Sequence, residues 1–141
     1  MLSDSDNVNA KESPMECPFC PERLEKEQHA VLENEHCLFL QPQHRVLVGS
    51  GFIIPREHRE TVFDLTPQEW AATQTLLLVV KAAVDKRFKP DGYNVGWNNG
   101  KVAGQTVLHV HMHVLPRFAG EPFAGRGIRW WLKSEDNLIV D

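Results

Sequence analysis

The sequence contains no apolar run that approaches the roughly 20 residues needed to cross a membrane. Its first residues, MLSDSDNVNAKES, include no apolar core of a secretory signal, so we expect a cytoplasmic protein with no membrane partner. A basic excess is also missing, because 15 Lys and Arg stand against 19 Asp and Glu, for a net charge of −4. This balance argues against a nucleic-acid partner, although a locally positive pocket can still take a small anion.

Cysteine is scarce, with three in 141 residues, and two of them form the pair Cys17-x-x-Cys20. In a chain without an export signal this spacing favours metal binding or redox chemistry over a disulfide framework. A length of 141 residues is enough for one domain with its own core. We therefore expect a flexible polar tail over residues 1–13 and a single domain over 14–141.

Short strands alternate with turn signals around one long helix. The strands are expected at His29–Glu33, Cys37–Gln41, Gly51–Pro55, Tyr93–Trp97 and Thr106–Leu115. The helix begins after Thr66, with Pro67 in its first position and Glu69 completing a capping box, and Pro90 stops it. Its expected core-facing stripe is Trp70, Thr73, Leu77, Val80 and Val84. Antiparallel strands packed against one helix predict an α+β domain.

Three histidines, His109, His111 and His113, alternate with apolar residues near the end of the chain. Alternate side chains of a strand share a face, so the three imidazoles would lie in a row, about 6.5–7 Å apart. One interpretation is a solvated polar face, and a second is a catalytic metal site. The third is nucleophilic catalysis, in which one ring nitrogen attacks and a hydrogen bond to the other fixes the tautomer.

The run GQTVLHVHMHVL at residues 104–115 resembles the signature of the histidine triad family of nucleotide hydrolases and transferases. The following LPR, residues 115–117, is most similar to the dinucleoside-polyphosphate hydrolase branch. The resemblance implies an antiparallel sheet of about five strands with one long helix, and a homodimer whose two sheets run together. It also implies cleavage at the α-phosphate of dinucleoside polyphosphates or nucleoside phosphoramidates. A nucleotidyltransferase, or a nucleotide-binding interaction protein with little turnover, stays open as an alternative.

The resemblance also assigns roles within the catalytic set. It makes His111 the nucleophile that forms a nucleotidyl-histidine intermediate. It makes His113 the histidine that steadies the nucleophile by hydrogen bonding, and His109 the first member of the triad. Gln105 corresponds to a residue that contacts phosphate oxygens and the leaving group.

The substrate-binding positions follow from the same resemblance. Thr106 matches a phosphate or leaving-group contact, and Asn98 matches an amide that touches the phosphate, although an Asn also suits a plain turn. Where the family often binds the ribose hydroxyls with an Asp or Asn, this chain has Pro42, which offers no side-chain acceptor. Gln41 or Gln43 is the expected substitute.

The cysteine pair needs two further ligands to close a tetrahedral zinc site. Candidates outside the triad are His29, His36, His44 and His58. The galactose-1-phosphate uridylyltransferases, distant relatives, look similar here: they add a histidine after a central strand and the one two residues before the nucleophile. That resemblance implies a structural zinc held by Cys17, Cys20, His58 and His109.

Overall fold

The structure is a computed structural model that describes residues 17–21, 23–24 and 30–140. The expected tail over 1–13 and the candidate ligand His29 lie outside the described residues. The strands are β1 (Ala30–Glu33), β2 (Cys37–Leu40), β3 (Gly51–Pro55), β4 (Gly92–Trp97) and β5 (Met112–Arg117). The long helix is α3 (Pro67–Phe88), and the 3₁₀ helices are η1 (Val62–Asp64), η2 (Lys101–Ala103) and η3 (Glu135–Asn137).

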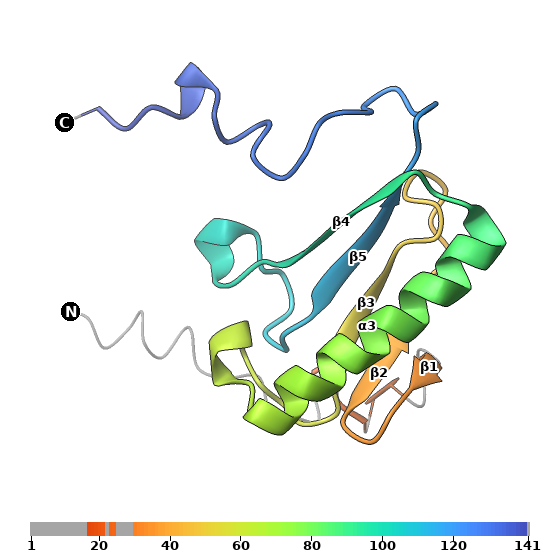
Figure 1. Ribbon diagram of the computed structural model, residues 1–141. Helices are drawn as coiled ribbons and strands as arrows, with labels where there is room; N and C mark the ends of the chain where they lie inside the picture. The colour runs from red at the N-terminus through yellow and green to blue at the C-terminus, as the bar shows by residue number, and fades with distance from the viewer. Residues whose placement is uncertain (1–16, 22, 25–29, 141) are drawn as a thin grey trace, which may run out of the picture.

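The five strands form one antiparallel sheet in the order β1-β2-β3-β5-β4. Helix α3 runs diagonally across one face, where it contacts β1, β2 and β3 (Figure 1). The predicted α+β fold, with five antiparallel strands and one long helix, is confirmed.

Helix α3 begins as the sequence predicts. The Thr66 hydroxyl accepts the Glu69 amide hydrogen at 3.1 Å, and the Glu69 carboxylate accepts that of Thr66 at 2.8 Å. The expected stripe needs two corrections, because the buried residues are Glu69, Thr73, Leu76, Val80 and Val84. Leu76 replaces Leu77, and Trp70 is 53% exposed because its ring stacks on Trp97, with 5.5 Å between centroids, instead of entering the core.

The sheet has an apolar cluster on each face. The helix-side cluster is Cys37, Phe39, Ile53, Leu76, Val80, Val84, Met112 and Val114. The cluster on the opposite face is Cys17, Phe19, Cys20, Leu24, Leu38, Leu40 and Ile54. The described N-terminal residues therefore cover the face of the sheet that α3 leaves free.

The predicted strand over Thr106–Leu115 is misplaced, since β5 begins at Met112 and runs on through Pro116. Its upstream end coincides with the end of both ladders, whose last pairs join Met112 to Ile53 on β3 and to Trp97 on β4. Beyond Val114, β5 no longer pairs with β3 and pairs with β4 alone. A strand with one free edge tolerates a residue that lacks an amide hydrogen.

The three histidines therefore do not sit on one strand: His113 belongs to β5, while His109 and His111 precede it. They do share a side of the sheet, as expected. The ring of Phe19 contacts those of His109 and His111, and the ring of Phe52 contacts those of His111 and His113.

None of the helices in the described part of the chain is long and apolar enough to span a membrane.

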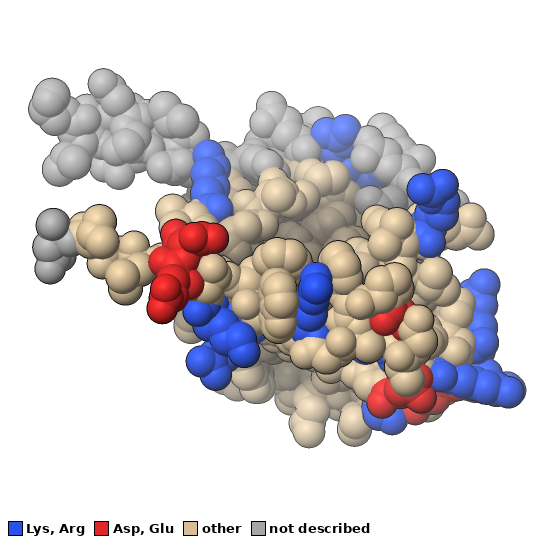
Figure 2. All heavy atoms as spheres, turned by 90° about the horizontal axis from the view of Figure 1, so that it is seen from above, with Lys and Arg blue, Asp and Glu red and all other residues tan. Residues whose placement is uncertain are grey.

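Figure 2 shows the molecule from above, with Lys and Arg side chains at separate places and Asp and Glu side chains between them. Most of this face is uncharged, so charges of neither sign dominate it.

Candidate active site and metal cluster

The imidazole of His111 is buried, with 6% of the residue exposed. Its Nδ1 lies 2.9 Å from the carbonyl oxygen of His109. Because a carbonyl oxygen can only accept, Nδ1 carries the hydrogen and Nε2 carries the lone pair. Burial lowers the pKa of His111, and the hydrogen bond to His109 offsets this only in part. His111 is therefore a neutral imidazole near pH 7, with a nucleophilic nitrogen at Nε2.

Three rings surround His111. The centroid distances are 5.0 Å to His113, 5.2 Å to Phe19 and 5.4 Å to Phe52. Both phenylalanines meet the imidazole edge to face. They fix the ring's orientation and exclude water from its sides. Sequence reasoning missed them, because Phe52 becomes a neighbour only once β3 is known to pair with β5.

Asn98 and His113 lie together beside the nucleophile. The amide nitrogen of Asn98 is 3.4 Å from Nε2 of His113. Burial, and then the neighbouring His111, lowers the pKa of His113, so this ring is also neutral near pH 7. Asn98 and His113 line a hollow of about 290 Å³ that Ile128 also borders. This hollow offers space for a substrate group next to the triad.

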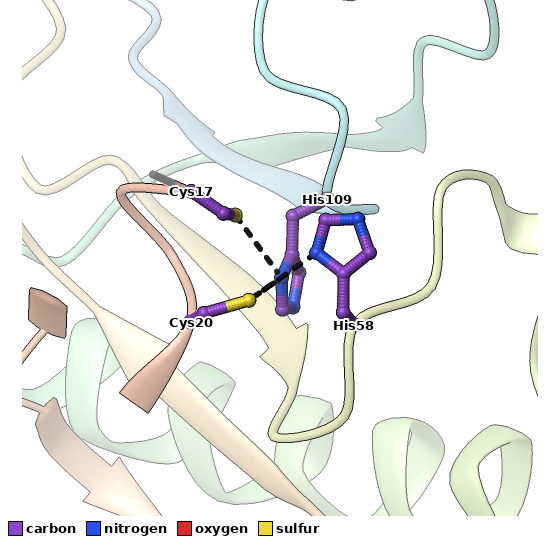
Figure 3. A group of neighbouring side chains, drawn as sticks. All are labelled: Cys17, Cys20, His58 and His109. Carbon is purple, nitrogen blue, oxygen red and sulfur yellow. Dashed lines mark hydrogen bonds between the residues drawn. The ribbon is translucent and has the colours of Figure 1, made fainter. Parts of the chain in front are cut away.

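The four expected zinc ligands converge in a second cluster (Figure 3). Their ligand atoms all lie within 4.8 Å of one another. The Nδ1 of His109 is 3.6 Å from Sγ of Cys17 and 3.5 Å from Sγ of Cys20, and the Nδ1 of His58 is 3.2 Å from Sγ of Cys20. Zinc bonds of about 2.3 Å to sulfur and 2.0–2.1 Å to nitrogen place S and N about 3.6 Å apart in a tetrahedron.

The protonation of His109 suits a metal ligand. Its Nε2 lies 2.8 Å from the carbonyl oxygen of Pro55, so Nε2 carries the hydrogen and Nδ1 presents its lone pair to the cysteines. Burial lowers the pKa of His109 to about 4, which keeps the ring neutral. The residues present therefore fit zinc. Of the other candidates, His44 accepts hydrogen bonds from the backbone amides of Val46 and Leu47 in its own loop. His36 lies beside Glu35.

Gln105 is buried and its neighbour Thr106 is exposed. Gln105 is 4% exposed, and its amide donates to the carbonyls of Glu60 at 2.6 Å and Val107 at 3.0 Å. Its Oε1 accepts the backbone amide hydrogen of Gly100 at 2.8 Å. Thr106 is exposed. The structure therefore turns Gln105 into the loop and leaves Thr106 at the surface.

Gln41 and Gln43 are not brought together with the triad. Both line a hollow of about 580 Å³ that Arg87 and Phe88 of α3 also line. The Gln41 amide donates to the carbonyl of Gly49 at 3.0 Å. Pro42 lines the same hollow. A ribose contact by either glutamine stays a prediction.

Comparison with known proteins places this geometry in a family. The HIT domain profile matches residues 23–120, and the chain belongs to the HIT domain family. It is 37% identical to the Bacillus subtilis protein named hit over 109 residues, which is 75% of this chain and 72% of that protein. It also resembles the crystal structure of a Zn-bound histidine triad family protein from Mycobacterium smegmatis. That similarity has a TM-score of 0.67 at 29% identity and covers 82% of this chain and 84% of that one.

Two relatives from Schizosaccharomyces pombe carry enzymatic names. The chain is 38% identical to the asymmetrical bis(5'-nucleosyl)-tetraphosphatase, over 51% of this chain and 40% of that protein. It is 38% identical to an adenosine 5'-monophosphoramidase, over 58% of this chain and 57% of that protein. The chain thus spans less than two thirds of either enzyme. The family includes nucleotide hydrolases of these two kinds.

Proposed function

We propose that this protein is a nucleotide hydrolase that cleaves at the α-phosphate of dinucleoside polyphosphates or nucleoside phosphoramidates. The observation that carries the proposal is the hydrogen bond from Nδ1 of His111 to the His109 carbonyl, which leaves Nε2 unprotonated. A buried neutral imidazole with a fixed tautomer is a prepared nucleophile. The two enzymatic relatives act on these substrate classes by their names.

The reaction runs in two displacements. Nε2 of His111 attacks the α-phosphorus, and the bond from phosphorus to the leaving oxygen or nitrogen breaks. The leaving group departs with the electron pair and takes up a proton. The ring then carries positive charge, which the His109 carbonyl stabilises through Nδ1–H. Water attacks the phosphorus, the electron pair returns to Nε2, and a nucleoside monophosphate and a proton are released.

Of the residues near His111, some contact the phosphate and others fix the shape of the loop around it. Asn98, beside His113, donates to phosphate oxygens, as does the exposed hydroxyl of Thr106. Gln105 shapes the phosphate-facing loop through its three hydrogen bonds. Phosphoryl transfer depends mainly on such positioning and charge stabilisation.

The zinc is structural in this proposal. Cys17, Cys20, His58 and His109 supply all four ligands, and a closed tetrahedral site leaves no position for water or substrate. Zinc would supply a rigid cross-link between the N-terminal residues, the loop after β3 and the segment before β5. The cytoplasmic location and the homodimer belong to the same proposal. Among the described residues β4 is the last strand of the sheet, and its outer edge is where a partner's sheet would continue it.

The test is mass spectrometry of the intact protein mixed with a panel of dinucleoside polyphosphates and nucleoside phosphoramidates. A short-lived adduct with the mass of one nucleotidyl group should form on the wild type and be absent from His111→Ala. The matched control is His36→Ala, which removes a histidine that lies outside the metal cluster. The adduct's mass also reports which base is preferred.

Turnover by His111→Ala at the wild-type rate would contradict the mechanism. Wild-type protein that binds nucleotides, forms no adduct and releases no product supports instead the nucleotide-binding protein. Release of product only when phosphate or a phosphosugar is added identifies a nucleotidyltransferase.

A further inference from the structure

The nucleophile lies outside the hydrogen-bonded ladder of the sheet. Strand β5 starts at Met112, so the backbone just upstream, residues 109–111, is paired with neither β3 nor β4. The amide hydrogen of Val110 is instead donated to the carbonyl oxygen of Arg59, at 2.7 Å. Val110 directly precedes His111 in the chain. The position of the attacking imidazole therefore depends on where the backbone of Arg59 lies.

The side chain of Arg59 is fixed by a buried carboxylate. Its Nε lies 3.0 Å and 3.2 Å from the two carboxylate oxygens of Glu69, whose side chain is 4% exposed. Burial raises the pKa of Glu69, but the hydrogen bonds from Thr66 and Arg59 outweigh it and hold that pKa below its usual range. Glu69 is thus ionised near neutral pH, and it stands on the first turn of the long helix.

Glu60, the residue after Arg59, holds the start of the segment 105–110 that leads to the nucleophile. The carbonyl of Glu60 accepts a hydrogen bond from the Gln105 amide at 2.6 Å. Arg59 and Glu60 together therefore fix both ends of the stretch 105–110, which leads into the nucleophile. Helix α3 is packed on the sheet through Thr73 and its buried neighbours, so it provides a rigid reference for these contacts.

From this chain of contacts we propose that the Arg59–Glu69 ion pair positions His111 for attack. The proposal rests on the proposed function only for the identity of the nucleophile. In this proposal both residues act through the backbone of Val110, whose amide hydrogen the Arg59 carbonyl accepts. Displacement of a reacting group by about 1 Å can cost as much as a hundredfold in rate, so the pair's loss should lower kcat and leave KM nearly unchanged.

The variants are chosen to keep the fold. Glu69→Gln retains an oxygen that can accept the Thr66 amide hydrogen, while Arg59→Lys retains the charge and loses the planar guanidinium. The matched controls are Asp85→Asn and Lys81→Met, which break the exposed Lys81–Asp85 pair on the same helix. For each protein we would measure kcat, KM, zinc content and melting temperature.

A second readout does not depend on activity. In protein labelled with ¹⁵N-histidine, the Nδ1–H of His111 gives its own imidazole signal, identified by its loss in His111→Ala. We expect Glu69→Gln to shift or broaden this signal and to lower kcat by roughly 10–100-fold, with zinc content unchanged. Arg59→Lys should lie between Glu69→Gln and the wild type.

Three results would overturn the proposal. One is an unchanged His111 signal together with an unchanged kcat in Glu69→Gln and Arg59→Lys. Another is an equal effect of Asp85→Asn and Lys81→Met on either readout. The third is loss of zinc in step with kcat, which would mean that Arg59 acts through the adjacent ligand His58. A wild type without hydrolase activity would defeat the proposed function, but the NMR signal would still test the positioning.

Discussion

His109 serves two sites at once: its carbonyl accepts the hydrogen bond of the His111 imidazole, and its own ring faces the two cysteines. The attacking group and the metal cluster are therefore joined through one residue. A disturbance of the metal cluster can therefore reach the nucleophile through the backbone carbonyl of His109. The carbonyl of Arg59, which holds Val110, is a second support that does not involve the cluster's ligand atoms.

Because the Arg59 carbonyl holds Val110 without the metal, loss of zinc should lower the stability of the fold more than it lowers kcat. Protein purified without chelator should carry about one zinc per chain, as a closed four-ligand site requires. Cys17→Ser combined with Cys20→Ser should lose the metal and lower the melting temperature by several degrees, with a smaller fall in kcat. Elemental analysis measures the zinc content, calorimetry the melting temperature and steady-state kinetics kcat. The matched control is Cys37→Ser, which changes a cysteine of the helix-side apolar cluster and should leave the zinc content unchanged. A wild-type protein without zinc would rule out the site.

Adjacent asparagines should respond differently to removal of the amide. Asn98 lies beside His113 at the proposed phosphate site, whereas Asn99 accepts the backbone amide hydrogen of Val62 at 2.9 Å. A hydrogen bond to a charged group contributes about 1.5–3 kcal/mol, so Asn98→Ala should lower kcat/KM by roughly tenfold to a hundredfold.

Asn99→Ala should instead lower the melting temperature, because it removes a structural hydrogen bond that contributes about 0.5–1.5 kcal/mol. It should leave kcat/KM within about threefold of wild type, because Asn99 holds the backbone of Val62. Steady-state kinetics and thermal unfolding of both variants provide the comparison. An equal loss of kcat/KM in the two variants would argue that Asn98 is also structural.

The sequence predicted the elements whose signals are local. The capping box at Thr66 and Glu69 places the start of α3 without knowledge of the rest of the fold. The short apolar segments Cys37–Gln41 and Gly51–Pro55 likewise predicted strands, which the structure confirms at Cys37–Leu40 and Gly51–Pro55. The zinc set needed the family resemblance, because nothing in the spacing singles out His58.

What the sequence could not predict depends on pairing across the sheet. The start of β5 at Met112 is where its ladders to β3 and β4 both end, and no local signal marks that point. The same holds for the ion pair of Arg59 with Glu69, which joins a loop to a helix ten residues later. Phe19 reaches His111 only because the described N-terminal residues pack on the free face of the sheet.

Stability should fall in acid through Glu69. Its pKa is lowered in the folded state, so the folded carboxylate holds its proton less tightly than the unfolded one. Its stabilising effect is fully present above the unfolded value near 4.5 and is lost as the pH falls through the lower, folded value. The gap in unfolding free energy between wild type and Glu69→Gln should therefore close in acid. Urea titrations at a series of pH values measure it, and a gap that widens below pH 4.5 would contradict the sign.

The ribose should be held less selectively in this protein than in relatives that carry an acidic ribose contact. Pro42 stands where the family resemblance expects an Asp or Asn that binds the ribose hydroxyls, and its side chain offers no acceptor. A hydrogen bond to a charged acceptor contributes about 1.5–3 kcal/mol, and 1.4 kcal/mol is a factor of ten. Discrimination between ribose and 2′-deoxyribose should therefore be weaker, by roughly tenfold or more, than in relatives with the acid.

Two glutamines flank this proline and could replace the lost acceptor. Gln41 already donates to the Gly49 carbonyl and lines the hollow beside α3, so Gln43, past the proline, is the better substitute. The measurement is kcat/KM for matched ribo and 2′-deoxy substrates in wild type, Gln43→Ala and Gln41→Ala. Any ribose preference should disappear in Gln43→Ala and persist in Gln41→Ala. A strong preference that survives both changes would show that another group holds the sugar, and that the position aligned with Pro42 is not the ribose contact in this chain.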